Sequence, residues 1–298
     1  MSQPRSRFGL SCALATPFGA DGAIDVTRFA AHARSRLSTG CSTVTAFGTT
    51  GEGASIGAAA REKALAGMRT AGIDMARQVV VGVAASSVEE ALAQAHQAAL
   101  FGCRTLLLAP PFYFKDVGDD GLIRWFAPVL EALGREGQRA ILYHIPSVTM
   151  VPLSQALIEE LKRQFPGTVF GVKDSSGDWS YARELLSRHT DLAILIGDER
   201  RLAEAVRLGA EGAISGLANF VPDLLLPLVD AGRDDARVTR IVDELLKYPV
   251  IPAVKELLGH ALGDRTWCSV TPPLEALSRD EAARLTAAFD AIAMGVHA

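Results

Sequence analysis

The chain has 298 residues, of which 49% are hydrophobic and 21% are charged, and its formal net charge is -4. This composition is typical of a globular protein that is long enough for a full core. It shows no basic cluster, which argues against nucleic acid as a partner, and no apolar run that could span a membrane. The four cysteines have no metal-binding spacing and indicate reduced thiols in a cytoplasmic protein: Cys12, Cys41, Cys103 and Cys268.

Short β-rich runs alternate with segments of helical period through most of the chain. The expected strands cover residues 10–15, 42–47, 79–83, 105–109, 140–144, 169–173, 193–196 and 212–215. The expected helices cover residues 25–38, 58–71, 88–101, 121–133, 154–164, 179–188, 200–208 and 222–229. The strands are mostly apolar, as is typical of a parallel sheet that is covered on both faces.

Eight such units predict an α/β fold of the (β/α)8 TIM barrel type, placed at residues 1–230. An open doubly wound sheet would carry a glycine-rich phosphate turn after its first strand, and residues 15–19 do not form one. Residues 231–298 are expected to form a C-terminal helical extension with helices at 233–248, 251–262 and 279–294. This extension could close one end of the barrel or build an oligomer interface.

Lys173 follows the apolar run of the sixth expected strand. A buried ammonium needs water or a partner, so one interpretation is an ion pair with an acid such as Asp174. The other is a partly desolvated amine, which loses its proton more easily and can attack a carbonyl to form a Schiff base. Active sites of such barrels lie at the carboxyl ends of the strands, which is where Lys173 is expected.

The second strand ends in Gly48-Thr49-Thr50-Gly51-Glu52. Two glycines around two hydroxyl residues indicate a tight turn with exposed backbone N–H groups, and such a turn can hold a carboxylate. The alternative is an ordinary strand-to-helix turn with threonine caps.

Tyr143 ends the fifth strand, one unit before Lys173, so its phenol could shuttle protons beside the amine. The alternative is a rim tyrosine with a hydrated hydroxyl. His144 has the opposite parity and is expected to face the helices in a structural role. Asp198 and Glu199, at the end of the seventh strand, are a weak signal for a metal site.

Taken together, these residues resemble the family of pyruvate-dependent class I aldolases that includes dihydrodipicolinate synthase and N-acetylneuraminate lyase. The resemblance covers nearly the whole chain and rests on residues 14–18, 48–52, 143–146, 171–178 and 212–219. It implies a lyase that condenses or cleaves a 2-keto acid through a pyruvate imine. The imine acts as the electron sink, so no metal or other cofactor is expected.

The resemblance also implies roles for single residues. Lys173 matches the lysine that condenses with the keto carbon, and Tyr143 matches the tyrosine that relays protons. Thr50 matches the hydroxyl of this relay. Tyr113 matches an aromatic residue that crosses from a partner subunit and completes it, within a homotetramer that is a dimer of dimers.

The remaining matches concern substrate binding. Thr49, Thr50 and Gly51 match the turn that binds the pyruvate carboxylate, and Ile214 matches a backbone contact near the bound pyruvate. Val148 departs from the pattern, because dihydrodipicolinate synthases usually have an arginine there that holds the carboxylate of aspartate semialdehyde. Valine cannot make that charge-assisted contact.

Three functions follow from these observations. The first is a lyase, or a related dehydratase, whose second substrate or product is an aldehyde derived from a sugar acid. The second is dihydrodipicolinate synthase, using pyruvate and aspartate semialdehyde despite Val148. The third is a barrel that binds keto acids without turnover, against which the joint presence of Lys173, Tyr143 and Thr50 speaks.

Overall fold

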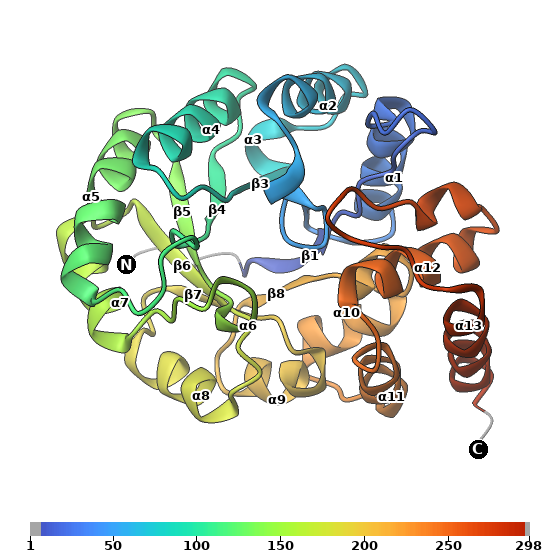
Figure 1. Ribbon diagram of the computed structural model, residues 1–298. Helices are drawn as coiled ribbons and strands as arrows, with labels where there is room; N and C mark the ends of the chain where they lie inside the picture. The colour runs from blue at the N-terminus through green and yellow to red at the C-terminus, as the bar shows by residue number, and fades with distance from the viewer. Residues whose placement is uncertain (1–6, 296–298) are drawn as a thin grey trace.

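The computed structural model describes residues 7–295 and shows one closed barrel of eight parallel strands, each paired with its neighbours in sequence order. Figure 1 looks into this barrel, with the helices arranged in a ring around the strands. The (β/α)8 prediction is therefore confirmed. The strands are β1 Gly9–Ala13, β2 Thr43–Ala46, β3 Val79–Val83, β4 Thr105–Leu108, β5 Arg139–His144, β6 Val169–Asp174, β7 Ala193–Ile196 and β8 Gly212–Ser215.

Helices follow the strands and cover the barrel on its outer side. The helices up to the eighth strand are α1 Val26–Ser38, α2 Ala58–Thr70, α3 Met75–Gln78, α4 Val88–Leu100, α5 Asp119–Arg135, α6 Pro146–Thr149, α7 Gln155–Gln164, α8 Trp179–Arg188 and α9 Leu202–Arg207. After it come α10 Pro222–Ala231, α11 Ala236–Leu245, α12 Val250–Leu262 and α13 Arg279–Ala293. The short α3 and α6 were not expected, since one turn of helix leaves no periodic pattern.

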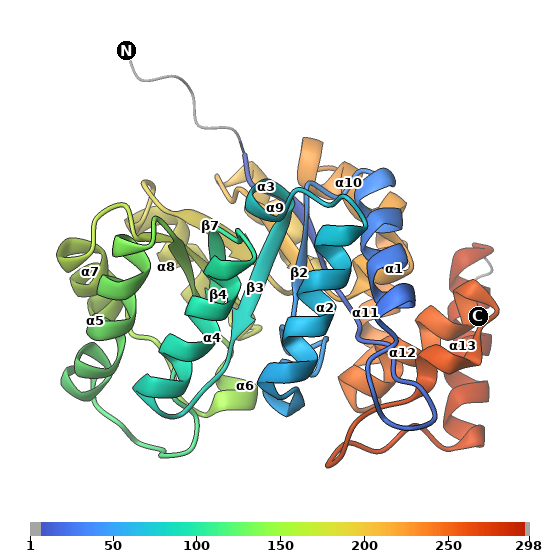
Figure 2. The same cartoon turned by 90° about the horizontal axis from the view of Figure 1, so that it is seen from above.

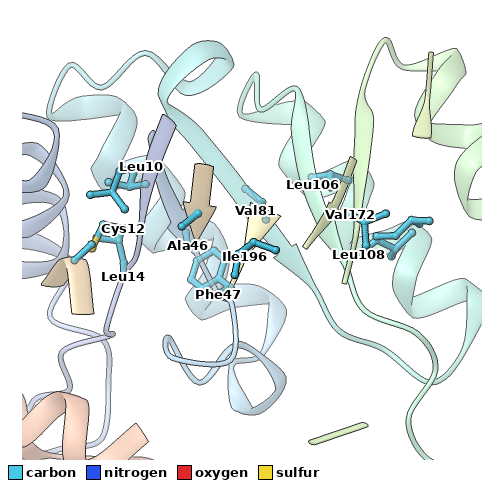
Figure 3. Close-up of a cluster of buried hydrophobic side chains, with 14 of the residues drawn as sticks. Leu10, Cys12, Leu14, Ala46, Phe47, Val81, Leu106, Leu108, Val172 and Ile196 are labelled. Carbon is cyan, nitrogen blue, oxygen red and sulfur yellow. The ribbon is translucent and has the colours of Figure 1, made fainter. Parts of the chain in front are cut away.

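Alternation along the strands divides the core into two layers. One layer lies inside the barrel and includes Val80, Leu107, Ile141, Leu195 and Ile214. The larger layer lies between the strands and the helices, and Figure 3 shows part of it. The residues labelled there are Leu10, Cys12, Leu14, Ala46, Phe47, Val81, Leu106, Leu108, Val172 and Ile196. Both strand faces are therefore buried, which is why the strands read as nearly continuous apolar runs.

The C-terminal helices α11, α12 and α13 pack on one another beyond the eighth unit. Figures 1 and 2 both place them on the same side of the barrel, the side that α1 and α10 cover. The expected helix 233–248 is shorter in the structure, because the Asp235 side chain caps its start by accepting a hydrogen bond from Arg237. Among residues 7–295, no helix is long and apolar enough to cross a membrane.

Candidate active site

A cavity of about 620 Å³ opens at the carboxyl ends of the strands. The loops after β2, β5, β6, β7 and β8 form part of its wall, together with α11 and α12. The expected site residues that line it are Thr49, Thr50, Tyr143, Val148, Lys173 and Ile214. A second cavity of about 270 Å³, lined mainly by apolar side chains, shares part of this wall.

Lys173 lies on β6 with its side chain turned into the barrel, and the residue is only 6% exposed. It pairs in register with Tyr143 on β5 and with Leu195 on β7. The Lys173 Nζ donates a hydrogen bond to the Tyr143 hydroxyl over 3.3 Å and lies 4.5 Å from the centroid of that ring. The ends of β5 and β6 therefore present an amine and a phenol to the same cavity.

The interpretation of Lys173 as one half of an ion pair with Asp174 is wrong. Neighbouring residues of a strand point to opposite faces, and the Asp174 carboxylate accepts a hydrogen bond from the Ser176 backbone over 3.0 Å. Burial raises the pKa of the Asp174 carboxyl. In the part of the chain that the structure describes, no carboxylate lies within 4.0 Å of the Lys173 amine.

The turn after β2 brings a hydroxyl to Tyr143, but this hydroxyl belongs to Thr49. The Thr49 Oγ1 lies 3.2 Å from the Tyr143 hydroxyl oxygen. The Thr50 side chain instead packs towards the end of β8, where a Cβ on Gly216 would lie 3.3 Å from the Thr50 Oγ1. The expectation that Thr50 supplies the hydroxyl beside Tyr143 is corrected to Thr49, because the two side chains leave the turn in different directions.

The backbone of this turn is held on one side by the segment after β1, and Thr49 and Thr50 line the cavity. The Thr16 hydroxyl donates to the Gly51 carbonyl over 2.7 Å, and a Cβ on Gly51 would lie 2.7 Å from the Leu14 carbonyl oxygen. Gly51 therefore contributes backbone only, and a side chain does not fit there. Within residues 7–295, the N–H groups of Thr49, Thr50 and Gly51 have no hydrogen-bond acceptor, and Thr49 and Thr50 line the cavity, where unpaired N–H groups can bind an anion.

Two further expected residues lie at the cavity, one deep and one at the rim. Ile214 is buried at the end of β8. Val148, on α6, is 58% exposed, and its side chain carries no charge to the rim.

Tyr113 lies outside both cavities of the single chain. It is 72% exposed, and its ring packs edge-on against Phe114, with 5.2 Å between the ring centroids. Its crossing into a partner subunit stays a prediction.

The acids after β7 are engaged with protein groups. Asp198 pairs with Arg200 at 2.8 Å, and Arg200 also contacts Asp243 on α11 at 2.9 Å. The buried Glu199 accepts a hydrogen bond from the Ser215 hydroxyl over 2.5 Å, and burial raises its pKa. No cluster of three metal-ligating side chains occurs among the described residues.

His144 has the structural role that its parity predicted. Its Nδ1 accepts a hydrogen bond from the Leu153 backbone over 3.0 Å, and its ring stacks on Tyr181 with 4.1 Å between centroids. Burial lowers the pKa of His144 to about 4, so the ring is neutral at pH 7.

Sequence reasoning missed an ion pair that supports the turn. The Lys255 Nζ on α12 donates to the Glu52 carboxylate over 2.5 Å and to the Thr16 carbonyl over 2.9 Å, and both charged side chains are fully buried. The other Glu52 oxygen accepts two hydrogen bonds from Thr271, one of them from its backbone N–H over 2.6 Å. A single lysine inside the apolar helix pattern at 250–262 was the available signal.

Comparison with known proteins agrees with this geometry. Residues 7–292 match the dihydrodipicolinate synthetase family. The chain is 34% identical to an uncharacterized DapA-like lyase of Chloroflexus aurantiacus, over 99% of each chain. It is 27% identical to the putative 2-dehydro-3-deoxy-D-gluconate aldolase YagE of Escherichia coli, over 81% of this chain and 80% of the relative.

Among solved structures, the chain is similar to the crystal structure described as dihydrodipicolinate synthase from Agrobacterium tumefaciens. The two are 51% identical and superpose with a TM-score of 0.93, over 96% of this chain and 99% of the other. The named activities of these relatives differ, so the similarity identifies a common scaffold and leaves the substrate to be argued from the cavity.

Proposed function

The chain belongs to the dihydrodipicolinate synthetase family and is a lyase, and from this premise we propose that it forms a pyruvate imine on Lys173. The observation that carries the proposal is the Lys173 amine, buried at the barrel mouth without an acid partner and 3.3 Å from the Tyr143 hydroxyl. A lysine kept for structure alone would be expected to pair with a carboxylate.

The proposed reaction begins when the neutral amine attacks the keto carbon of pyruvate. The amine nitrogen loses its two protons and the keto oxygen takes up two, with Tyr143 relaying them, so that the oxygen leaves as water and the C=N bond of the imine replaces the C=O bond. The imine then withdraws electrons while a proton leaves the methyl carbon, which gives an enamine. The enamine carbon attacks an aldehyde, or the same steps run backwards and release one.

The turn after β2 suits the pyruvate carboxylate. The free N–H groups of Thr49, Thr50 and Gly51 can donate to its oxygens, and charge-assisted hydrogen bonds of this kind are the strong ones. With the carboxylate held there, the keto carbon is presented to Lys173, and the Thr49 hydroxyl lies beside Tyr143 to extend the proton path.

We further propose that the second substrate is an aldehyde from a sugar acid. The rim beside Lys173 carries the hydroxyls of Ser147, Ser175 and Ser176, which can donate to and accept from a polyhydroxylated chain. The name of the YagE relative, a putative 2-dehydro-3-deoxy-D-gluconate aldolase, points the same way. A dehydration through the same imine belongs to this proposal as a variant.

The synthase reaction with aspartate semialdehyde is the second candidate, favoured by the description of the Agrobacterium relative. Val148 argues against it, because its exposed side chain at the rim carries no charge and cannot make a charge-assisted contact with the carboxylate of aspartate semialdehyde. Turnover of pyruvate with aspartate semialdehyde should be compared with cleavage of 2-dehydro-3-deoxy-D-gluconate. Equal or faster synthase turnover would contradict the sugar-acid proposal.

The imine itself is tested by trapping with pyruvate and borohydride, followed by peptide mass analysis. The adduct is expected on Lys173 and should be absent from Lys173→Ala. Lys162→Ala is a matched control, because that lysine lies on α7 and pairs with Asp191. An adduct on another lysine, or none, would refute the assignment.

Hydrogen exchange at the methyl group of pyruvate distinguishes an enzyme from a barrel that only binds keto acids. Enamine formation replaces the methyl protons of pyruvate with deuterium in D2O, which NMR detects without any second substrate. We expect exchange with the wild-type protein and none with Lys173→Ala. An adduct without exchange, and without turnover of any keto acid, would favour the binding protein.

We also propose a cytoplasmic homotetramer in which Tyr113 reaches a neighbouring site. Its exposed ring is available for such a contact. Light scattering should give the mass of four chains, and Tyr113→Phe should slow deuterium exchange if its hydroxyl completes the relay.

A further inference from the structure

Arg61, on α2, is a buried cation that the proposed reaction does not use. It is 1% exposed, and in the described part of the chain no carboxylate lies within 4.0 Å of its guanidinium. Its Nη2 donates to the Gly82 carbonyl over 2.5 Å, its Nη1 donates to the Gly53 carbonyl over 3.4 Å, and its Nε has no partner. A buried charge with such weak compensation is costly, which suggests a function.

The three groups that Arg61 contacts also contact one another. The Arg61 guanidinium carbon lies 4.5 Å from the centroid of the Phe47 ring. A Cβ on Gly53 would lie 1.8 Å from the Phe47 carbonyl oxygen, and a Cβ on Gly82 would lie 2.2 Å from the same atom. The guanidinium therefore contacts all three segments that meet here: Phe47 before the turn, Gly53 after it and Gly82 on β3.

This meeting point fixes a strained backbone. Phe47 and Glu52, which bracket residues 48–51, adopt positive φ angles of 59° and 58°, and neither is glycine. The Gly53 N–H donates to the Gly48 carbonyl over 3.1 Å and closes the turn. Arg61 donates a hydrogen bond to the Gly53 carbonyl, and Lys255 donates one to the Glu52 carboxylate. These two contacts fix the residues at the end of the turn.

We propose that Arg61 is a positioning residue of the carboxylate-binding turn, which it holds in shape and to which it supplies a buried positive charge. This inference rests on the proposed function, in which residues 49–51 bind the carboxylate of a 2-keto acid. A guanidinium suits the task because it stacks on a ring and donates to two carbonyls at once.

The charge persists under the conditions of the reaction. Burial lowers the pKa of Arg61 to about 10, and the charge of Glu90 acts in the opposite direction, so the group is cationic at pH 7. Lys255 is paired with Glu52 at 2.5 Å, which largely cancels its charge, whereas among the described residues no carboxylate lies within 4.0 Å of the Arg61 guanidinium. Fixed charges in a low-dielectric interior act over longer distances than charges in water.

The test compares two ligands that differ in charge at the turn. Half-saturating concentrations of pyruvate and of neutral pyruvamide are measured by borohydride trapping on Lys173. In Arg61→Met, we expect the value for pyruvate to rise about tenfold, since the turn that holds the carboxylate loses a buried positive charge behind it. The value for pyruvamide should change less than about twofold, because it never used the charge. The rate of deuterium exchange at saturating pyruvate should stay within about threefold of wild type.

Two further variants complete the design. Arg61→Lys keeps the charge but cannot donate to the Gly53 and Gly82 carbonyls in the same geometry. The preference for pyruvate over pyruvamide, taken as the ratio of their half-saturating concentrations, should therefore fall by about threefold. Arg69→Met removes an exposed arginine from the same helix, one that stacks on Phe101, and should leave the preference unchanged. If Arg61→Met does not fold, the Arg61→Lys preference decides, and an unchanged value would overturn the proposal.

A merely structural role would give another pattern. Equal losses for pyruvate and pyruvamide, or a fall in the exchange rate at saturation with an unchanged preference, would overturn the inference while leaving the imine in place. A wild-type protein without an adduct on Lys173 would refute the proposed function, and the inference about Arg61 would fall with it.

Discussion

The hydroxyl of Tyr143 lies between two groups that can exchange protons with it. The Lys173 amine donates to it over 3.3 Å, and the Thr49 hydroxyl oxygen lies 3.2 Å from it. Thr50 is the next residue along the chain but lies towards Gly216. A matched pair of substitutions can therefore separate the two threonines.

Thr49→Val is expected to slow deuterium exchange into pyruvate by about a hundredfold, the usual scale of a lost proton-transfer group. Thr50→Val keeps the shape of its residue and should slow exchange much less. Both variants keep the turn backbone, so half-saturation by pyruvate should change little. A larger loss of exchange in Thr50→Val than in Thr49→Val would restore the role that the family resemblance gave to Thr50.

At this scale the sequence predicts side chains on strands better than side chains in turns. Alternation placed Lys173 and Tyr143 in the barrel and His144 on the helix side, because a strand has a fixed period of two. The turn at 48–51 has no such period, and the positive φ angles of Phe47 and Glu52 at its ends leave no sequence signal. Arg61 and Lys255 could not be assigned either, since their contacts are made only once distant elements pack.

The elements are joined at the mouth by the buried pair of Glu52, after β2, and Lys255, on α12. This pair connects the C-terminal extension to the turn, and Thr271 adds a contact from the segment before α13. Eight strand–helix units were predictable from period and capping residues. The attachment of the extension was not, because the single lysine in the apolar pattern at 250–262 signals a buried charge but does not identify Glu52 as its partner.

Lys255→Met should lower the free energy of unfolding by about 3–5 kcal/mol, because it leaves the Glu52 carboxylate buried and unpaired. The double variant with Glu52→Gln should be less destabilised than the sum of the single variants, since neither charge is then left alone. Urea unfolding provides the measurement. Lys247→Met, in the exposed pair with Glu244, is the control and should leave stability unchanged. Additive losses would show that the buried pair does not couple the two elements.

The described residues include three buried histidines that resist protonation, because burial lowers the pKa of His32, His144 and His189. Burial lowers the pKa of His32 and of His144 to about 4, and the hydrogen bond that the His32 ring donates to the Asn219 side-chain oxygen opposes the shift at His32. His32 lies on α1 and contacts Asn219, which bonds to the backbone of residues 13 and 15 near the closure of β1 with β8. His144 ties β5 to the loop before α7. Protonation therefore acts on two opposite regions of the barrel.

The sign of the effect follows from linkage. The unfolded chain binds these protons near pH 6.5 and the folded chain near pH 4, so the stabilisation is complete above pH 6.5 and is lost as the pH falls towards 4. At pH 5 each histidine should cost about 2 kcal/mol relative to pH 7. Asp174 and Glu199, whose pKa values burial raises, act in the opposite direction.

The histidine contribution is isolated by comparing wild type with His144→Gln and His32→Gln in urea unfolding at pH 7 and pH 5. Each variant should be less stable at pH 7 but should lose less stability on acidification. An equal loss in wild type and both variants would show that the two rings do not control the acid sensitivity of the fold.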